Sequence, residues 1–157
     1  MRIGHGYDVH RFTDGNEIII GGISIPYEKT LLAHSDGDVL IHAIADALLG
    51  AAGERDIGYH FPDNSNEYKN IDSKILLARV KEIISKKGFQ IEYIDSTIVA
   101  QAPKMSPYIE KMRENLANAF KTDIQNVSVK ATTEERLGFT GEGLGISAHA
   151  VCLLESV

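Results

Sequence analysis

Three side chains with nitrogen or oxygen donor atoms stand out by type and spacing: Asp8, His10 and His42. Asp8 and His10 lie two residues apart in a segment, 2–10, that alternates with the period of a strand, so their side chains leave the same face. His42 lies in an apolar segment, 39–49, that is predicted to be a helix. Two ligands from a strand and one from a helix would leave a fourth tetrahedral position open, which is typical of catalytic rather than structural zinc.

Each of these residues also has an ordinary explanation. An Asp-x-His pair is common without a metal, and a single histidine on a helix is more often a core or surface residue than a ligand. The polar run 34–38 favours a site, because capping of the helix by Ser35 or Asp36 explains only part of it. Asp46, one turn after His42, could orient the imidazole or lie in solvent, and the sequence leaves both open.

Composition limits the kind of protein this is. The 157 residues are 43% hydrophobic and 24% charged, typical of one globular domain, and we expect a single domain over 1–157. The net charge of −6 argues against general nucleic-acid affinity. Cys152, the only cysteine, excludes an internal disulfide and a cysteine-cluster zinc site, and its apolar surroundings predict a buried thiol. We expect no membrane span and no signal segment, and therefore a cytoplasmic protein.

Periodicity and turn residues predict an α+β fold, a mixed β-sheet with helices packed on it. A hairpin is expected over 17–26, with the Gly21-Gly22 pair at its turn. The predicted helices run over about 37–52, from 72 or 73 to Gly88, and from Ser106, which would cap a helix beginning with Pro107. Further strands are predicted over 89–101, 127–131 and 145–154, and a long loop over 54–66.

Other polar groups indicate phosphate chemistry. Backbone N–H groups near 35–38, at a helix start, could hold a phosphate. Thr132, Thr133 and Glu135 offer hydroxyls and a carboxylate for phosphate oxygens and a hard cation, although a helix start with acids in its first turn would look the same. No nucleophile elbow, Walker loop or dinucleotide fingerprint is present. These patterns together predict a metal-assisted reaction on a phosphorylated small molecule.

Six short runs, each weak alone, occur in a specific order over essentially the whole chain. They are 4–10 (GHGYDVH), 32–39 (LAHSDGDV), 56–58 (DIG), 61–63 (FPD), 100–105 (AQAPKM) and 137–141 (LGFTG). Together they resemble the 2-C-methyl-D-erythritol 2,4-cyclodiphosphate synthases, the cyclases of the non-mevalonate isoprenoid pathway. The resemblance implies a chorismate-mutase-like α+β protomer with its helices on one face of the sheet, and a homotrimer with active sites between subunits.

The resemblance also implies a reaction. In this family 4-diphosphocytidyl-2-C-methyl-D-erythritol 2-phosphate cyclises when its 2-phosphate attacks the β-phosphorus and expels CMP, so the enzyme is a phosphorus–oxygen lyase. One zinc per subunit is implied on the triad named above, and Mg²⁺ or Mn²⁺ on Glu135, bridging the α- and β-phosphates. His34 and Thr133 match positions that stabilise the transition state.

The remaining matched positions are implied to bind substrate. On the erythritol side they are Asp56, Ile57, Gly58, Phe61, Pro62, Asp63, Asn64 and Ser65. On the cytidine side, contributed by the adjacent subunit, they are Ala100, Gln101, Ala102, Pro103, Lys104, Met105, Ser106 and Thr132. Further binding positions are Asp8, Val9, His10, His34, Ser35, Thr133, Glu134, Glu135, Phe139 and Glu142. We expect the 56–66 loop to close over the ligand, because water would hydrolyse the diphosphate.

The chain departs from the family pattern near its C-terminus. Many members carry Arg and Glu where this chain has Glu142 and Leu144, positions that line a central trimer cavity in which an isoprenoid diphosphate binds. An acid in place of the arginine repels a diphosphate, so we predict weak or absent binding there. Glu134 also replaces a common threonine, which adds charge beside Glu135.

Two other functions stay open on the sequence alone. A zinc-dependent phosphoesterase or amidohydrolase would release a linear product, because metal-bound water would attack. A trimeric nucleotide-binding or metal-storage protein would bind CDP without releasing CMP from the substrate.

Overall fold

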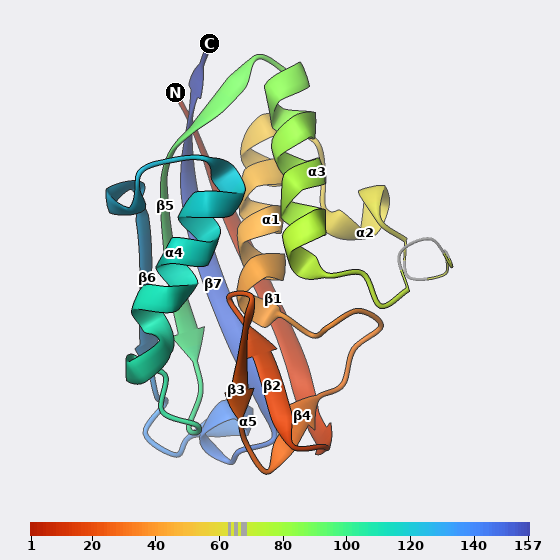
Figure 1. The fold of residues 1–157 in the computed structure, drawn as a ribbon, viewed down its shortest axis with the longest axis vertical. Coiled ribbons are helices and arrows are strands. Elements are labelled where there is room, and N and C mark those ends of the chain that lie inside the picture. The colour runs from red at the N-terminus through yellow and green to blue at the C-terminus, as the bar shows by residue number, and fades with distance from the viewer. Residues whose placement is uncertain (63, 65, 67–68) are drawn as a thin grey trace.

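The computed structural model describes residues 1–62, 64, 66 and 69–157. Four strands are followed by three helices before strands and helices mix in the second half of the chain, an order that confirms the predicted α+β class (Figure 1). In sequence they are β1 (Arg2–Asp14), β2 (Glu17–Ile20), β3 (Ile23–Pro26), β4 (Lys29–Leu31), α1 (Val39–Ala52), α2 (Ile57–His60), α3 (Ser73–Lys86), β5 (Phe89–Val99), the 3-10 turn η2 (Ser106–Tyr108), α4 (Ile109–Phe120), the 3-10 turn η3 (Ile124–Asn126), β6 (Val127–Thr132), α5 (Gly138–Gly141) and β7 (Gly145–Ser156).

The main sheet has five strands in the order β4-β1-β7-β5-β6. Its pairs are antiparallel except for β5 and β6, which run parallel, so the sheet is mixed. The strands β2 and β3 form a separate hairpin. The long helices α1, α3 and α4 lie on one side of the sheet, as Figure 1 shows.

Helix α1 lies directly on β1 because two glycines of that strand leave room for it. A Cβ on Gly4 would lie 2.0 Å from the carbonyl oxygen of Ala47, and one on Gly6 would lie 1.9 Å from that of Ala43. Gly4 and Gly6 share a strand face with Asp8 and His10, further along β1. The same close approach therefore brings the two donor side chains of β1 beside the start of α1.

The start of α1 is fixed by a buried carboxylate. Asp38 is the N-cap and accepts the Ile41 N–H at 3.1 Å, so the prediction of Ser35 or Asp36 as the cap was wrong. The same carboxylate accepts the N–H groups of Gly21 and Gly22 at 2.9 and 2.8 Å, which ties the β2–β3 turn to the helix. Complete burial raises the pKa of Asp38 to about 6, although these bonds oppose the shift.

Other sequence predictions need smaller corrections. Periodicity missed β4, α2 and α5, since elements of three or four residues contain too few positions to show a period. Ser106 does not cap a helix: it begins η2 after Met105, and α4 begins at Ile109. Cys152 is buried as predicted, and burial raises the pKa of its thiol to about 12. None of the helices within the described ranges has the length and apolar character that crossing a membrane requires.

Candidate metal and substrate site

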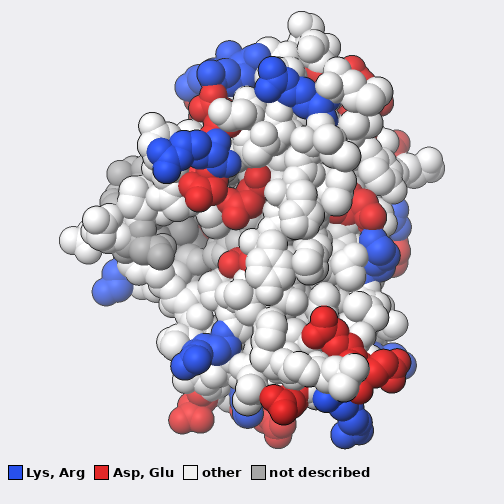
Figure 2. Space-filling model, turned by 180° about the vertical axis from the view of Figure 1, so that it is seen from behind, with Lys and Arg blue, Asp and Glu red and all other residues white. Residues whose placement is uncertain are grey.

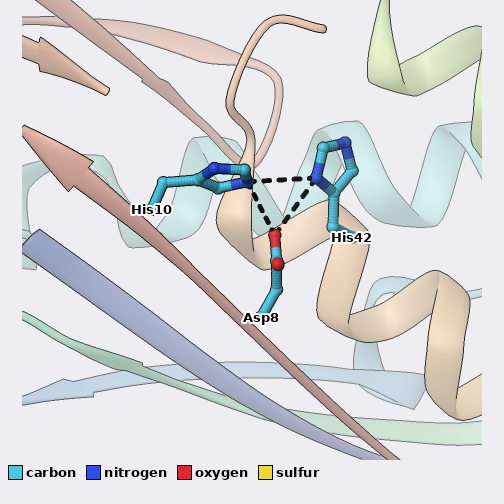
Figure 3. A group of neighbouring side chains, drawn as sticks. All are labelled: Asp8, His10 and His42. Carbon is cyan, nitrogen blue, oxygen red and sulfur yellow. Dashed lines mark hydrogen bonds and ion pairs between the residues drawn. The ribbon is translucent and has the colours of Figure 1, made fainter. Parts of the chain in front are cut away.

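The predicted triad converges in space (Figure 3). Nε2 of His10 lies 2.9 Å and Nδ1 of His42 lies 3.1 Å from the same Asp8 carboxylate oxygen. The two imidazole nitrogens are 3.5 Å apart. His42 is buried and the other two side chains are half-buried. One oxygen and two nitrogens thus form a small triangle at the edge of a pocket.

The triangle has the size that a zinc ion requires. With zinc–ligand bonds of about 2.0–2.1 Å, the ligand atoms of a tetrahedral site are separated by about 3.3 Å. The three observed separations, 2.9, 3.1 and 3.5 Å, bracket that value. Two imidazoles and a carboxylate are also ordinary zinc ligands, so the donor chemistry and the spacing of Asp8, His10 and His42 both fit the ion.

Charge is concentrated at this triangle. Burial opposes ionisation of Asp8, but its bonds to His10 and His42 outweigh that effect and lower the pKa of the carboxyl to about 2. Burial likewise opposes protonation of His42, yet the hydrogen bond and charge of Asp8 raise its pKa. In the metal-free triangle Asp8 and His42 are therefore a paired acid and base, and a cation of higher charge would take the place of the proton that His42 shares with Asp8.

The far nitrogen of each imidazole has its own partner. Nδ1 of His10 lies 3.2 Å from the carbonyl oxygen of Leu32, and Nε2 of His42 lies 3.2 Å from the hydroxyl of Ser73. Asp46 does not orient His42, as the sequence left open, because its carboxylate accepts the N–H of Ile57 at 2.8 Å. These contacts turn one nitrogen of each ring toward the triangle.

A pocket of about 190 Å³ opens beside the triad, and Phe61 and Leu76 form part of its wall. Its other lining residues are Asp8, His10, Ala33, His34, Ser35, His42, Ile57, Gly58 and Ile71. Nε2 of His34 is buried and has no hydrogen-bond partner among the described residues. An unpaired buried nitrogen at a pocket is available to a ligand oxygen.

The predicted erythritol-side residues divide into two groups. Ile57, Gly58 and Phe61 line the pocket, whereas the carboxylate of Asp56 caps α2 by accepting the Tyr59 N–H at 3.0 Å. Pro62 and Asn64 belong to the same loop but do not line the pocket. Asp63 and Ser65 lie outside the described residues, so their predicted roles stay predictions.

The N–H groups proposed for phosphate binding at 35–38 are partly occupied. Of these groups, the Asp38 N–H donates to Asp36 at 3.1 Å. Ser35 and His34 remain the polar side chains of this segment that line the pocket.

A second polar region lies on a different part of the surface. Residues 131–139 are all exposed, and 133–137 form the loop between β6 and α5, so Thr133 and Glu135 do not begin a helix as the sequence left open. Thr133 accepts the Glu135 N–H at 3.2 Å, and the Gln101 side chain accepts the Arg136 N–H at 3.1 Å. These bonds hold Glu135 and Arg136 in the left-handed region, at φ 55° and 64°.

The same loop explains the unusual acid at 134. One oxygen of the exposed Glu134 carboxylate accepts the hydroxyl proton of the buried Thr140 at 2.5 Å, which ties the loop to α5. The predicted role of Glu134 in substrate binding stays a prediction.

The two regions are separated across the sheet. Asp8 pairs with Ala148 of β7, Ala148 with Ile98 of β5, and Ile98 with Ala131 of β6. Three strand spacings of about 4.8 Å place Asp8 about 14 Å from Ala131, next to the second region. Consistently, no residue of 100–106 or 132–135 lines the triad pocket.

Comparison with known sequences decides the family. The sequence model of the YgbB family matches residues 1–155. The chain belongs to the YgbB family. The 2-C-methyl-D-erythritol 2,4-cyclodiphosphate synthase of Pseudomonas putida (strain W619) is 59% identical over 154 residues, 98% of each chain. The synthase of the same name from Francisella tularensis subsp. novicida (strain U112) is 60% identical over 155 residues, which cover 98% of each chain.

Solved structures agree with this membership. A CDP complex of IspF from Plasmodium falciparum is 37% identical, covering 99% of this chain and 96% of that one with a TM-score of 0.86. The bifunctional IspDF from Campylobacter jejuni is 38% identical with a TM-score of 0.95. The match covers 99% of this YgbB-family chain but 42% of the bifunctional one.

The C-terminal departures of this YgbB-family chain lie near an open apolar groove of about 770 Å³. Phe139 and Leu144 line it together with Tyr7, Val9, His10, Arg11, Phe12, Leu32 and Gly145. Glu142 does not line the groove in the single chain. The predicted weak binding of an isoprenoid diphosphate, which depends on Glu142, stays a prediction.

The sequence missed two residues around the triad, Asp36 and Ser73. Asp36 was interpreted as a capping candidate and as part of the polar run 34–38, and Ser73 only as a possible helix start, 31 residues from His42 in the sequence. The signal available was weak: a serine at the start of a helix that follows a long, aperiodic loop.

Proposed function

We propose that this YgbB-family chain is a cyclodiphosphate synthase. It converts 4-diphosphocytidyl-2-C-methyl-D-erythritol 2-phosphate into 2-C-methyl-D-erythritol 2,4-cyclodiphosphate and CMP, as a single domain over 1–157 working in the cytoplasm. The observation that carries the proposal is the Asp8–His10–His42 triangle, which has zinc-like spacing and opens on a pocket that contains the unpaired His34. The name of the Pseudomonas putida relative and the CDP bound to Plasmodium falciparum IspF support it.

The triad residues would hold one zinc ion. When bound, zinc supplies positive charge that polarises phosphate oxygens and offsets their mutual repulsion. His10 would bind it through Nε2 and His42 through Nδ1, because their other nitrogens face Leu32 and Ser73. Asp8 would contribute its carboxylate, whose low pKa keeps it ionised at neutral pH.

The remaining pocket residues would position the substrate. A 2-phosphate oxygen forms a bond to the β-phosphorus, and the bond from that phosphorus to the oxygen bridging it to the α-phosphorus breaks, so CMP leaves. Ile57, Gly58 and Phe61 would hold the erythritol end against the pocket wall. His34 would donate to a phosphate oxygen as negative charge redistributes. Because phosphoryl transfer depends mainly on alignment and charge neutralisation, the protein needs no nucleophile of its own.

The second cation requires a second chain. Glu135 would hold Mg²⁺ or Mn²⁺ at the α- and β-phosphates, with Thr132 and Thr133 as hydroxyl partners of the diphosphate and 100–106 on the cytidine. The α- and β-phosphorus atoms of a diphosphate share one oxygen, so groups that bind both phosphates must lie close together. The segment that contains Glu135, however, lies about 14 Å across the sheet from the triad of the same chain. A site that holds both cations therefore combines the triad of one subunit with Glu135 of its neighbour. We infer a homotrimer of chorismate-mutase-like protomers, with its active sites between subunits.

The side of the sheet away from the helices fits such an assembly. Figure 2 shows that its middle is largely white with a few Asp and Glu side chains, while Lys and Arg lie at the top and around the edges. Its large exposed hydrophobic residues are Ile3, Tyr7, Val9, Tyr93 and Val151, between 40% and 72% exposed. An apolar face of this kind marks an interaction surface, and here the occupant would be further copies of the same chain.

The proposal is tested by phosphorus NMR of the purified protein with zinc, Mg²⁺ and the cytidyl substrate. We expect equal amounts of CMP and the cyclic diphosphate. His42→Ala should lose both zinc and turnover, whereas His60→Ala, which removes an imidazole that does not line the pocket, should keep bound zinc. A linear phosphate product would instead identify a hydrolase. CDP binding without CMP release, with zinc retained, would identify a binding protein.

A further inference from the structure

A buried hydrogen-bonded chain runs from the metal triad to the first turn of α3. Nε2 of His42, on the side of the ring away from Asp8, lies 3.2 Å from the Ser73 hydroxyl. That hydroxyl donates to Asp36 at 2.5 Å, and the Ser73 N–H donates to the other Asp36 oxygen at 2.9 Å. Ser73 is fully buried.

Asp36, at the end of this hydrogen-bonded chain, determines which groups in it donate and which accept. Asp36 also accepts the Asp38 N–H, so its carboxylate faces three donors. The Ser73 hydroxyl is one of them and therefore uses its hydrogen in the bond to Asp36. The hydroxyl oxygen is then left with lone pairs for His42, whose Nε2 must carry a proton to bond to it. In the neutral ring that binds a metal, a proton on Nε2 leaves the lone pair on Nδ1, and Nδ1 is the nitrogen that faces Asp8.

We propose that Ser73, oriented by Asp36, is the positioning residue that fixes the ring and tautomer of His42 for metal binding. The proposal rests on the metal site of the proposed function. It assigns to the serine–aspartate pair the role that a single carboxylate or carbonyl has at other metal-bound histidines. His10 has such a carbonyl, that of Leu32, so the two imidazoles of the triad are oriented by different means.

A neighbouring serine provides a matched control. The Ser35 hydroxyl lies 3.3 Å from the same Nε2 of His42, only slightly further than that of Ser73. Ser35 lies at the pocket and is half-buried, and no described carboxylate accepts its hydroxyl proton. Distance alone would make the two serines equivalent, whereas the proposed chain makes only Ser73 important.

The pair also links the triad to the substrate loop. Ser73 is the first residue of α3 and follows the loop that contains the predicted erythritol-side residues. Asn70 N–H donates to the His34 carbonyl at 3.2 Å, so the end of that loop is joined to 34–36 at two points. The orientation of His42 and the position of the loop end are thus set by the same few bonds.

The test measures zinc affinity by competition with a chelating dye, and the visible absorption of the cobalt-substituted protein. Ser73→Ala should weaken zinc binding by about ten- to a hundredfold and alter the cobalt spectrum. Ser35→Ala should change the affinity less than about threefold. Melting temperatures of the metal-free proteins show whether the variants fold. Equal losses for the two serine variants would overturn the proposal.

Asp36→Ala supplies a second arm, because Asp36 and Ser73 act through the same hydroxyl. The double variant with Ser73→Ala should then bind zinc about as weakly as Ser73→Ala alone, since effects through a shared link are not additive. Additive losses would contradict the chain. Unchanged zinc binding in His42→Ala would instead refute the metal site itself, which separates failure of the proposed function from failure of this inference.

Discussion

The two polar regions of this chain are built in opposite ways. The Asp8–His10–His42 triangle is half-buried or buried, and Leu32 and Ser73 lie against the far nitrogens of its imidazoles. Residues 131–139 are exposed throughout, and Thr133 and Gln101 accept backbone N–H groups of this segment, whereas neither contacts the Glu135 carboxylate. The first region is complete within one chain, whereas the second presents groups outward. Under the proposed function, the triad is the part of the site that one chain supplies in full, and the exposed region is the part that a neighbouring chain would use.

The largest expected effect comes from separating the two regions into different chains. Asp8→Ala and Glu135→Gln should each be nearly inactive alone. Trimers formed by refolding the two variants together should recover about one quarter of wild-type CMP release, because half the triads are intact and half of their neighbours carry Glu135.

Refolding each variant with itself is the control for this mixing experiment. Recovery near zero, with mixed trimers present by native mass spectrometry, would mean that both regions of a site come from one chain. That result would contradict the shared-site proposal.

The next effect concerns the apolar sheet face. Val151 is 40% exposed on the central strand β7. If other copies of the chain cover this face, Val151→Asp would place a charge in a buried interface. Native mass spectrometry should then show monomers in place of trimers. The monomers should retain zinc, because the triad is complete within one chain.

The matched control is Ile75→Asp, which places the same charge at a 53% exposed hydrophobic position on α3, on the helix side. This variant should remain trimeric. Trimers of unchanged stability in Val151→Asp would show that the sheet face is not the interface.

A smaller effect tests how α1 positions His42. Gly6→Ala places a methyl group where the Ala43 carbonyl oxygen would be 1.9 Å away, so the helix must move off β1. We expect a loss of about 3 kcal/mol in the free energy of unfolding, measured in urea, and weaker zinc binding.

Gly50→Ala on the same helix is the control, because nothing lies within 4 Å of its added methyl group. It should stabilise the protein by about 0.5–1 kcal/mol and leave zinc affinity unchanged. Equal stability of the two variants would mean that the close approach of α1 to β1 does not hold the site together.

Local pattern made much of this protein predictable. The alternation of 2–10 placed Asp8 and His10 on one strand face, and the apolar segment around His42 predicted its helix, so the triad could be proposed before any coordinates. The three long helices and the long strands were likewise expected, because they span enough residues to show a period. Short elements such as α2 and β4 span too few.

Only the tertiary structure assigned partners to the polar residues around the triad. Asp36, Asp38 and Asp46 look alike in sequence, yet one orients Ser73, one caps α1 and one accepts the Ile57 N–H. A carboxylate accepts any donor placed near it, so its role depends on which segments the fold brings beside it. The sequence therefore determined which groups could bind a metal, while the packing of α1, β1 and α3 decided which of them lie together and how they are oriented.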